Sequence, residues 1–424
     1  MARNRIIYQS EALFVGPTDG GQHTAHKHIN RVQSISHDMS ATRTDIYEFG
    51  RLAPLDKVMI EAPTVTLDFS YLCTNGDQED KLGLIVAGHT IAASDARVQQ
   101  FDKAGVADGA GFPGMISGIV DDGTVSPGEK NYYVVTVPEA QDVNGNSVND
   151  NREFNGYSVV GFGNGVLSNY SVNGAVGDFP TASVSVEAFN VSFISGFKSD
   201  DTDAFISGNA IPSVEKGKSK LQAGQFELPS PTTGDMNVFA LRPGDISLNF
   251  KATDTSSSVD EKAMVIGGAT LTSSDPEAAT ESALQAEPMH LQSFSLDAPL
   301  TRTALTRLGS TFPYYRAIEF PIDVTLNTSA YLSDIQTGSL VDIICSDEKR
   351  NIDIDMRIPC AGATRDADTA ISLKYRLKNA QIISQNFAAA IGDTKTVDLS
   401  FQAQYGGAQD TVNGLFISGA PSTS

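Results

Sequence analysis

The sequence predicts a mainly β protein made of two tandem domains of sandwich or barrel type, each with a short flanking α-helix. Three observations support this prediction: runs of alternating apolar and polar residues, abundant turn residues, and an internal repeat. The chain has 424 residues with 37 Gly and 18 Pro, and at about 150 residues per domain this length suits two or three domains. With 40% hydrophobic residues, it can bury a substantial core.

Alternation with a period of two is typical of strands that place one face on a core and the other towards water or a neighbour. Six segments follow this pattern and are therefore predicted strands. They are Thr64–Leu72, Asn131–Val137, Ala182–Phe193, Asp245–Phe250, Asn351–Ile358 and Thr396–Ala403.

Helical signals are sparse. Ser94–Gly105 has a Ser N-cap and a Gly stop, which together predict a short helix. Pro276–Pro288 has Pro at both ends and good helix formers between them, so it is predicted as a second short helix. We expect both helices to pack on sheets.

An internal repeat is the most informative feature of the chain. Gln33–Thr44 reads QSISHDMSATRT and Gln292–Thr303 reads QSFSLDAPLTRT, with seven of 12 positions identical at an offset of 259. At the same offset, Gly50 falls on Gly309. This block alone indicates two related β-rich units.

Two further blocks are collinear with the first. Val176–Ala188 matches Ile391–Ala403 at an offset of 215, and Phe205–Gly208 matches Phe416–Gly419 at an offset of 211. Three collinear blocks predict a tandem duplication of one domain.

These offsets predict the domain organisation. The first domain is expected at 1–210, with insertions at about 81–114 and 141–154. Residues 211–260 form either a connector or a small accessory β element, and the second domain is expected at 261–424.

The formal net charge is −21. Such a surface repels phosphate, which argues against a protein that reads nucleic-acid grooves. It remains compatible with a surface that must avoid adhering to DNA.

Cellular location is constrained by three features. Cys73, Cys345 and Cys360 are too few for a disulfide framework, and their spacing matches no zinc motif, so we expect free thiols in a reducing compartment. The N-terminus has no continuous apolar signal region. The longest apolar stretch, around Leu82–Gly88, is far shorter than the roughly 20 residues that cross a bilayer.

Candidate metal ligands fall in two places. His23, His26 and His28 lie in a Gly/Thr-rich segment, which is either a solvent-exposed linker or a transition-metal site. A second segment has oxygen-bearing residues at the spacing of a calcium loop but has Ser147 where that loop needs Gly. It is either a polar hairpin tip or a calcium or magnesium loop, with the candidate ligands Asp142, Asn144, Asn146, Asp150 and Glu153.

Two Arg–Thr pairs occupy matched places in the repeat, Arg43–Thr44 and Arg302–Thr303. Each Arg has two interpretations. It is either a buried structural residue tied to backbone carbonyls, or an interface residue that meets a carboxylate of the next subunit.

No motif for a phosphate loop, a nucleophile elbow or a zinc protease occurs, so we expect no catalytic activity and no cofactor other than the possible calcium. Asp353 and Asp355 alternate along a predicted strand, which is typical of an ordinary solvated face.

One segment resembles a known family. Arg31–Gly76 contains a strand, an Arg–Thr turn, the loop FGRLA and then PTVTLDFSY. In this order they are similar to the opening of tail tube proteins of tailed bacteriophages. The resemblance covers about 45 residues, and about 90 with the second copy.

This resemblance implies tube-type β domains whose inner strands join those of neighbouring subunits around a lumen, with loops that plug each ring into the next. A fused pair of domains implies trimeric, pseudo-hexameric rings. The function implied is that of a major tail tube subunit in the virion tail, assembled in the host cytoplasm, through which double-stranded DNA passes without specific binding. The implied partners are further copies of the chain, a tape measure protein, and tail terminator or distal tail proteins.

Two alternatives stay open. One is the inner tube of a contractile tail or secretion system. The other is a virion surface β-sandwich adhesin or decoration protein, although such proteins favour exposed aromatic platforms and this chain has no Trp.

Overall fold

The computed structural model describes residues 11–18, 25–60, 62–87, 114–120, 128–136, 155–198, 205–212, 221–227, 241–252, 290–309, 313–331, 349–357, 371–388, 394–407, 410 and 412–419. Strands dominate these residues, and the predicted mainly β fold is confirmed. No helix in this described part is long and apolar enough to cross a membrane.

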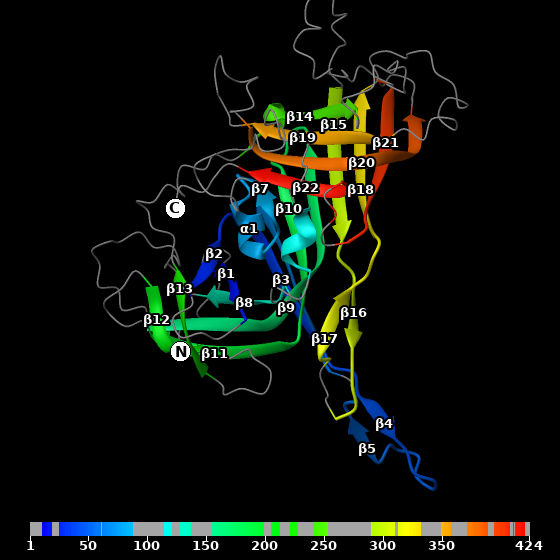
Figure 1. The fold of residues 1–424 in the computed structure, drawn as a ribbon. Helices are drawn as coiled ribbons and strands as arrows, with labels where there is room; N and C mark the ends of the chain where they lie inside the picture. Colours follow the sequence, from blue (N-terminus) through cyan, green and yellow to red (C-terminus); the bar gives the residue numbers. More distant parts are fainter. Residues whose placement is uncertain are drawn as a thin grey trace, which may run out of the picture.

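The strands are numbered as in Figure 1. Those of the N-terminal half are β1 (Glu11–Pro17), β2 (Ala25–Ile29), β3 (Val32–Ser40), β4 (Thr44–Ile46), β5 (Asp56–Val58), β6 (Thr64–Leu72), β7 (Val86–Ala87), β8 (Lys130–Thr136), β9 (Asn155–Ala175), β10 (Thr181–Ala188), β11 (Asn190–Lys198), β12 (Phe205–Pro212) and β13 (Leu221–Glu227). Those of the C-terminal half are β14 (Ile246–Ala252), β15 (His290–Pro299), β16 (Arg302–Leu305), β17 (Tyr315–Ile318), β18 (Ile322–Tyr331), β19 (Arg350–Arg357), β20 (Ile371–Ala388), β21 (Thr396–Tyr405) and β22 (Gly414–Gly419).

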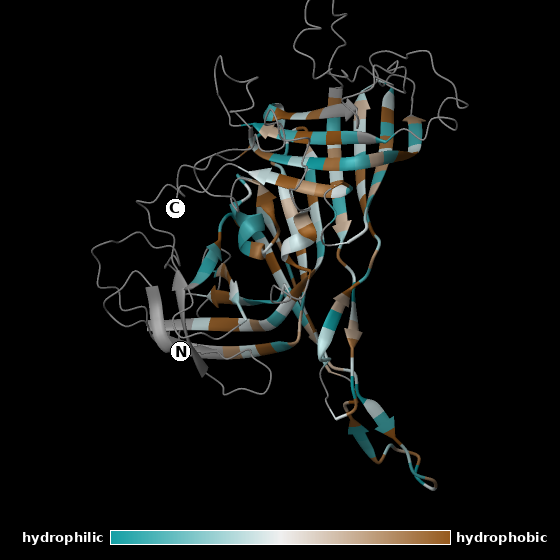
Figure 2. Cartoon of the chain, in the orientation of Figure 1, coloured by the Kyte–Doolittle hydropathy of each residue, from teal (hydrophilic) through white to brown (hydrophobic). Residues whose placement is uncertain are grey.

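One antiparallel sheet runs through both halves and is called the common sheet here. Its strand order is β3–β6–β10–β9–β15–β18–β21–β20, so the two halves meet where β9 pairs with β15. The alternation in the sequence explains the burial: in β10 every second side chain is buried. Figure 2 shows the resulting alternation of apolar and polar residues along β15, β18 and β21.

Each half also has an outer sheet that packs on the common sheet. The N-terminal outer sheet has the order β12–β13–β2–β1–β8–β9–β11, and the C-terminal one has the order β14–β19–β20–β22–β7. The strands of the C-terminal outer sheet run across those of the common sheet (Figure 1). A single apolar core, which includes Leu67, Tyr170, Leu296 and Leu415, spans both halves.

The two halves share one pattern of strand pairing. The β3–β6 pairing recurs as β15–β18 at an offset of 259, and both pairings shift register at the matched places Val32/Ser34 and Leu291/Ser293. The β9–β10 pairing recurs as β20–β21 at an offset of 215, again with register shifts at matched places.

Strand pairing contradicts the third repeat block, which aligned Phe205–Gly208 with Phe416–Gly419. Phe416–Gly419 lies in β22, which pairs with β20 as β11 pairs with β9. Phe205–Gly208 lies instead in β12, whose partner is β13. The reason is that the letters FISG occur twice in the first half, and Phe193–Gly196 in β11 is the copy in the corresponding strand.

The helix predictions missed the α-helix that the structure describes. This helix, α1, spans Asp77–Leu82 between Gly76 and Gly83, which both have left-handed backbone conformations. The signal in the sequence was the pair of Gly residues around DQEDKL, since Gly is common at helix C-termini. The predicted helices at Ser94–Gly105 and Pro276–Pro288 lie outside the described residues.

The segment 211–260, expected as a connector or accessory element, contains β13 and β14. The strand β13 extends the N-terminal outer sheet through β2, whereas β14 pairs with β19 as β1 pairs with β8. The proposed domain boundaries and the insertions stay predictions, since most of 81–114 and all of 141–154 lie outside the described residues.

The long strands β9 and β20 each pass from an outer sheet into the common sheet at an Asn residue. Asn164 and Asn379 have φ values of 51° and 54°, a left-handed conformation that Asn adopts more readily than most residues. The backbone N–H of each donates to a buried Asn side chain, Asn131 Oδ1 at 3.0 Å and Asn351 Oδ1 at 3.1 Å.

We expect Asn351→Ala to destabilise the protein, because the N–H of Asn379 loses its acceptor at the strand corner. The expected loss in the free energy of unfolding is about 1–3 kcal/mol, measured by urea denaturation. The control is Asn386→Ala at an exposed position of β20, for which a change below about 0.5 kcal/mol is expected. Equal effects of the two substitutions would contradict the role of Asn351.

Candidate functional site

The common sheet has one apolar and one polar face. Its apolar face belongs to the core, and its polar face consists almost entirely of hydroxyl, amide and carboxylate side chains. Examples from neighbouring strands are Ser70 on β6, Ser183 on β10, Asn173 on β9 and Ser295 on β15, which lie on the side opposite the buried residues of their strands.

Every charged side chain that the eight described strands place on this polar face is acidic, and one of them, Glu187, forms an ion pair with Arg316 of β17 at 3.3 Å. They are Asp38, Asp68, Glu187, Asp297, Asp323 and Asp398. The outward positions of the described strands hold no Lys or Arg. The face is therefore hydrophilic and repels anions.

Side chains on neighbouring strands hydrogen-bond across this face. The Ser34 and Ser70 hydroxyls lie 2.7 Å apart, and Gln404 donates to Asp323 Oδ1 at 2.7 Å. Across the boundary between the halves, Asn169 donates to Asp297 Oδ1 at 3.2 Å. These bonds occupy part of the polar groups and hold the face in one arrangement.

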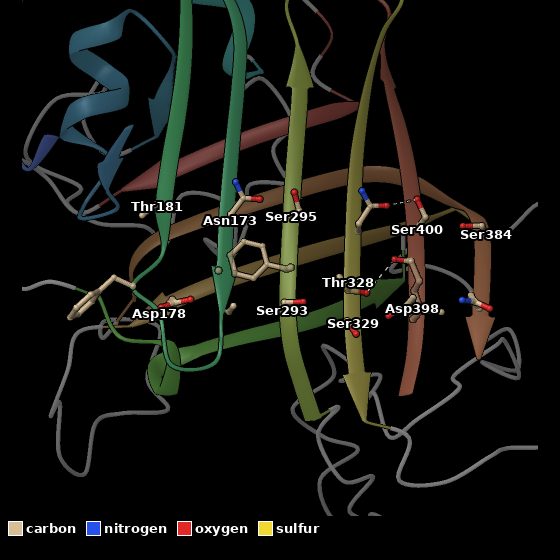
Figure 3. Close-up of a pocket in the computed structure, with 17 residues that line it drawn as sticks. Asn173, Asp178, Thr181, Ser293, Ser295, Thr328, Ser329, Ser384, Asp398 and Ser400 are labelled. Carbon is tan, nitrogen blue, oxygen red and sulfur yellow. Dashed lines mark hydrogen bonds between the residues drawn. The ribbon is translucent and has the colours of Figure 1, made fainter. Parts of the chain in front are cut away.

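One end of the polar face forms an open concavity of about 530 Å³ (Figure 3). Side chains from six strands and from the β9–β10 turn line it, among them Asn173, Asp178, Ser293, Ser329 and Asp398. Its lining contains no basic residue, so it shares the chemistry of the whole face.

Two hairpin arms extend from the opposite end of the common sheet (Figure 1). The N-terminal arm, residues 41–60, carries β4 and β5, and the C-terminal arm, residues 300–320, carries β16 and β17. The side chains at their tips, Phe49 and Leu308, are fully exposed and equivalent at the offset of 259. Exposed apolar side chains on a projecting arm are typical of a protein contact.

The base of the C-terminal arm is docked on the N-terminal half. Arg302 donates to the backbone carbonyls of Ile119 at 3.0 Å and of Arg316 at 3.4 Å. Arg316 donates to the carbonyl of Glu187 at 3.0 Å and lies over the ring of Phe189 at 4.1 Å. Burial lowers the pKa of the Arg302 guanidinium, which nevertheless keeps its charge.

The two Arg–Thr pairs thus lie in different surroundings. Arg302 has the backbone-carbonyl contacts of the structural interpretation, and the Thr303 hydroxyl donates to the Glu319 carboxylate. Arg43 and Thr44 are exposed on the N-terminal arm. Unlike the C-terminal arm, this arm is not docked on the other half within the described residues. The structure does not bring the two pairs together.

The common sheet ends in two edge strands, β3 and β20, which pair on one side only within its described residues. Three large apolar side chains are exposed on them: Met39 at 55%, Ile383 at 56% and Phe387 at 43%. Edges with exposed apolar residues tend to pair with further strands.

The candidate metal sites do not gain support. The interpretation of the His segment as an exposed linker is wrong for His26, which lies in β2 with 3% of its surface exposed and packs on Tyr133. Burial lowers the pKa of both His26 and His28 to about 4. Among the described residues no group of three His, Cys, Asp or Glu residues could hold a metal ion; His23 and the five candidate calcium ligands from Asp142 to Glu153 lie outside that set.

The expectation of a solvated face at Asp353 and Asp355 is also wrong. Both carboxylates are buried on the C-terminal outer sheet. Arg376 binds Asp353 through two hydrogen bonds of 2.6 and 2.7 Å, and Lys374 lies 3.4 Å from Asp355. The alternation in β19 could not reveal this, because both faces of the strand are covered.

Cys73 is a free, buried thiol, as expected. Cys345 and Cys360 lie outside the described residues.

No family model and no curated protein matches this chain. One similar solved structure is entitled "Virion of native gene transfer agent (GTA) particle", with 12% identity over 29% of this chain and 79% of that chain and a TM-score of 0.17. Another is "Crystal structure of Hcp protein", with 10% identity over 41% of this chain and 98% of that chain and a TM-score of 0.20. Both TM-scores are too low for either likeness to support a function.

The matched arginines allow a direct comparison. We expect Arg302→Ala to lower the free energy of unfolding by about 1–3 kcal/mol, because the carbonyl of Ile119 loses a charged donor. Arg43→Ala should leave it unchanged within error, because that side chain is exposed. Urea denaturation of both variants of the unassembled chain measures the difference. Equal losses would show that Arg43 also has an intrachain role.

Proposed function

We propose that this protein is a structural subunit that polymerises into a hollow tube, and that it acts as the major tail tube protein of a tailed bacteriophage. The observation that supports this most is the common sheet, which within its described residues has an unpaired edge at each end and places no Lys or Arg on its polar face. A self-assembling sheet with such a face suits a conduit wall. The proposal assigns no catalysis and no cofactor to the chain.

The boundary between the two halves serves as a template for the boundary between subunits. Within the chain, β9 pairs with β15, and their counterparts in the repeat are β20 and β3. These counterparts are the two free edges. We therefore infer that β20 of one subunit pairs with β3 of the next, as β9 pairs with β15 inside the chain, and that the two repeated units arose by duplication.

The β9–β15 pairing also predicts which residues of β20 and β3 lie opposite each other between subunits. Asp297 lies opposite Ser171 in the chain, so at offsets of 259 and 215 Asp38 should lie opposite Asn386 of the next subunit. Met39 would then face Gln385, and the exposed Phe387 would lie opposite His37. This pairing would cover the exposed apolar side chains of both edges, which is a favourable contribution.

Each chain supplies two similar sets of four strands to such a wall, so three chains would close a pseudo-hexameric ring. Closed rings remove every free edge of a sheet. In this ring the N-terminal arm would dock on the C-terminal half of the next subunit, as the C-terminal arm docks on its own N-terminal half. Arg43 would thereby gain the environment of Arg302.

The polar face would line the lumen. Six carboxylates per chain, of which only Glu187 pairs with an Arg within the described residues, would repel the phosphates of double-stranded DNA, so that DNA slides without binding. The exposed tips Phe49 and Leu308 would reach the next ring. The partners proposed are further copies of the chain, a tape measure protein and tail terminator or distal tail proteins, in a virion tail assembled in the host cytoplasm.

The inner tube of a contractile tail or secretion system would use the same edges and arms, and it remains the second candidate. A surface adhesin or decoration protein is less well supported, because such proteins favour exposed aromatic platforms and this chain has no Trp.

A cysteine pair tests the register. We expect the double variant Asp38→Cys/Asn386→Cys to form covalent links between chains in assembled protein, because directly opposite residues on paired strands have Cβ atoms about 4.5–5.5 Å apart. A short thiol cross-linker and denaturing gel electrophoresis should give a ladder that ends at three chains. Negative-stain electron microscopy of the same sample should show hollow tubes.

Matched controls accompany this test. Ser171→Cys/Asp297→Cys occupies the template positions and should link only within one chain, and each single variant should form no ladder. A ladder ending at six chains would keep the tube but reject the trimer. Tubes without links would reject the register, and the absence of both tubes and links would contradict the proposed function.

Reversing charge on the polar face tests the conduit. We expect Asp297→Lys/Asp323→Lys/Asp398→Lys tubes to retain duplex DNA in a strongly salt-dependent manner, whereas wild-type tubes retain none. Sedimentation of tubes with labelled duplex measures retention. A duplex with a bulky protein at each end is the control, since it cannot enter a lumen; equal retention of this duplex would place the face outside.

A further inference from the structure

A short segment of the N-terminal half, residues 73–87, connects the two halves away from the common sheet. Its strand β7 pairs in parallel with β22, joining Val86 to Ile417 and Ala87 to Ser418. Its carbonyl at Thr74 accepts a hydrogen bond from the Ser372 hydroxyl at 3.2 Å. The segment therefore holds the C-terminal outer sheet against the N-terminal half.

A carboxyl group lies at the centre of this contact. Glu79 of α1 is completely buried, and its Oε1 accepts hydrogen bonds from the hydroxyls of Tyr71 and Tyr170, each at 2.9 Å. Tyr375 of the C-terminal half reaches the same oxygen at 3.4 Å, and its hydroxyl lies 2.8 Å from that of Tyr170. The other oxygen, Oε2, has no hydrogen-bond partner among the described residues.

The described residues around Glu79 offer no counter-ion for an ionised carboxyl. The titratable groups that face Glu79 are Tyr71, Cys73, Tyr170 and Tyr375, and Asp77 acts on it from within α1. None of these groups is cationic, and the nearby Lys81 forms an ion pair with Asp77 at 2.6 Å. Burial raises the pKa of Glu79, and a backbone hydrogen bond and those from Tyr71 and Tyr170 reverse only part of this rise.

We propose that Glu79 is a proton-operated latch between the two halves, which is closed while its carboxyl is protonated and opens when the carboxyl ionises. In the closed state the neutral carboxyl joins tyrosines from β6, β9 and β20. Opening lets water reach the carboxylate and releases segment 73–87 from β20. The latch concerns the single chain and does not depend on the proposed tube function.

The direction of the pH dependence follows from linkage. A group whose pKa is higher in the closed state contributes stability that is complete below its ordinary pKa, 4.5 for Glu79. This stability is lost as the pH rises through the closed-state pKa. Between those two values the open population should grow by about tenfold for each pH unit and then level off.

The reactivity of Cys73 reports the opening, because its thiol is buried beside Tyr375 and Glu79. We would compare wild-type protein with Glu79→Gln, a neutral side chain of the same shape, from pH 5 to 9. A disulfide-exchange reagent labels the thiols, and peptide mass spectrometry isolates the signal of Cys73. Since the intrinsic pH dependence of the thiol is common to both proteins, the ratio of their rates isolates the latch.

We expect this ratio of wild-type to Glu79→Gln rates to rise by up to about tenfold per pH unit and then to reach a plateau. A ratio that stays flat, or that falls with pH, would overturn the proposal. If Glu79→Gln does not fold, hydrogen exchange of residues 73–87 in the wild-type chain replaces it. Exchange that rises more steeply with pH than the intrinsic chemistry would support the latch, and exchange that follows the intrinsic chemistry would refute it.

Discussion

The pairing of β9 with β15 is the interaction on which the remaining structure depends. It converts two similar four-strand units into one sheet of eight strands, and it places the polar side chains of both units on the same face. A shift of this pairing by one residue would invert one half relative to the other, because side chains alternate between faces. The register shifts shared by both halves keep this alternation aligned across the whole sheet.

Because the two halves share one pattern of strand pairing, the chain shows equivalent segments in two environments. The C-terminal arm lies on a neighbouring half, where Arg302 is partly buried and Arg316 is buried, whereas the N-terminal arm leaves Arg43 exposed. The arms have similar sequences, so the difference comes from the presence or absence of a neighbour. An apolar arm without a neighbour is costly in water, and assembly would remove this cost.

The sequence could predict most strands because one face of each contacts the core and the other is polar. β6 and β21 obey this rule, and the predictions Thr64–Leu72 and Thr396–Ala403 match them closely, whereas the prediction Ala182–Phe193 runs past the end of β10 into β11. The rule does not locate polar residues in strands that are buried on both faces. In β19, Asp353 contacts Arg376. The equivalent pair in the N-terminal half is Tyr133 and Gly161. The sequence also did not predict the edges of the common sheet or the Glu79 cluster, because pairing between strands far apart in the chain decides which residues meet.

Two of the contacts that hold the two halves together differ in physical character. The common sheet joins them through seven residue pairs between β9 and β15, and backbone pairing of this kind is insensitive to pH in the neutral range. The contact through segment 73–87 depends instead on a carboxyl that tyrosines of both halves share. Since a buried carboxyl without a cation is unfavourable when ionised, only the second contact responds to protons. The outer sheet can therefore loosen while the strand order of the common sheet persists.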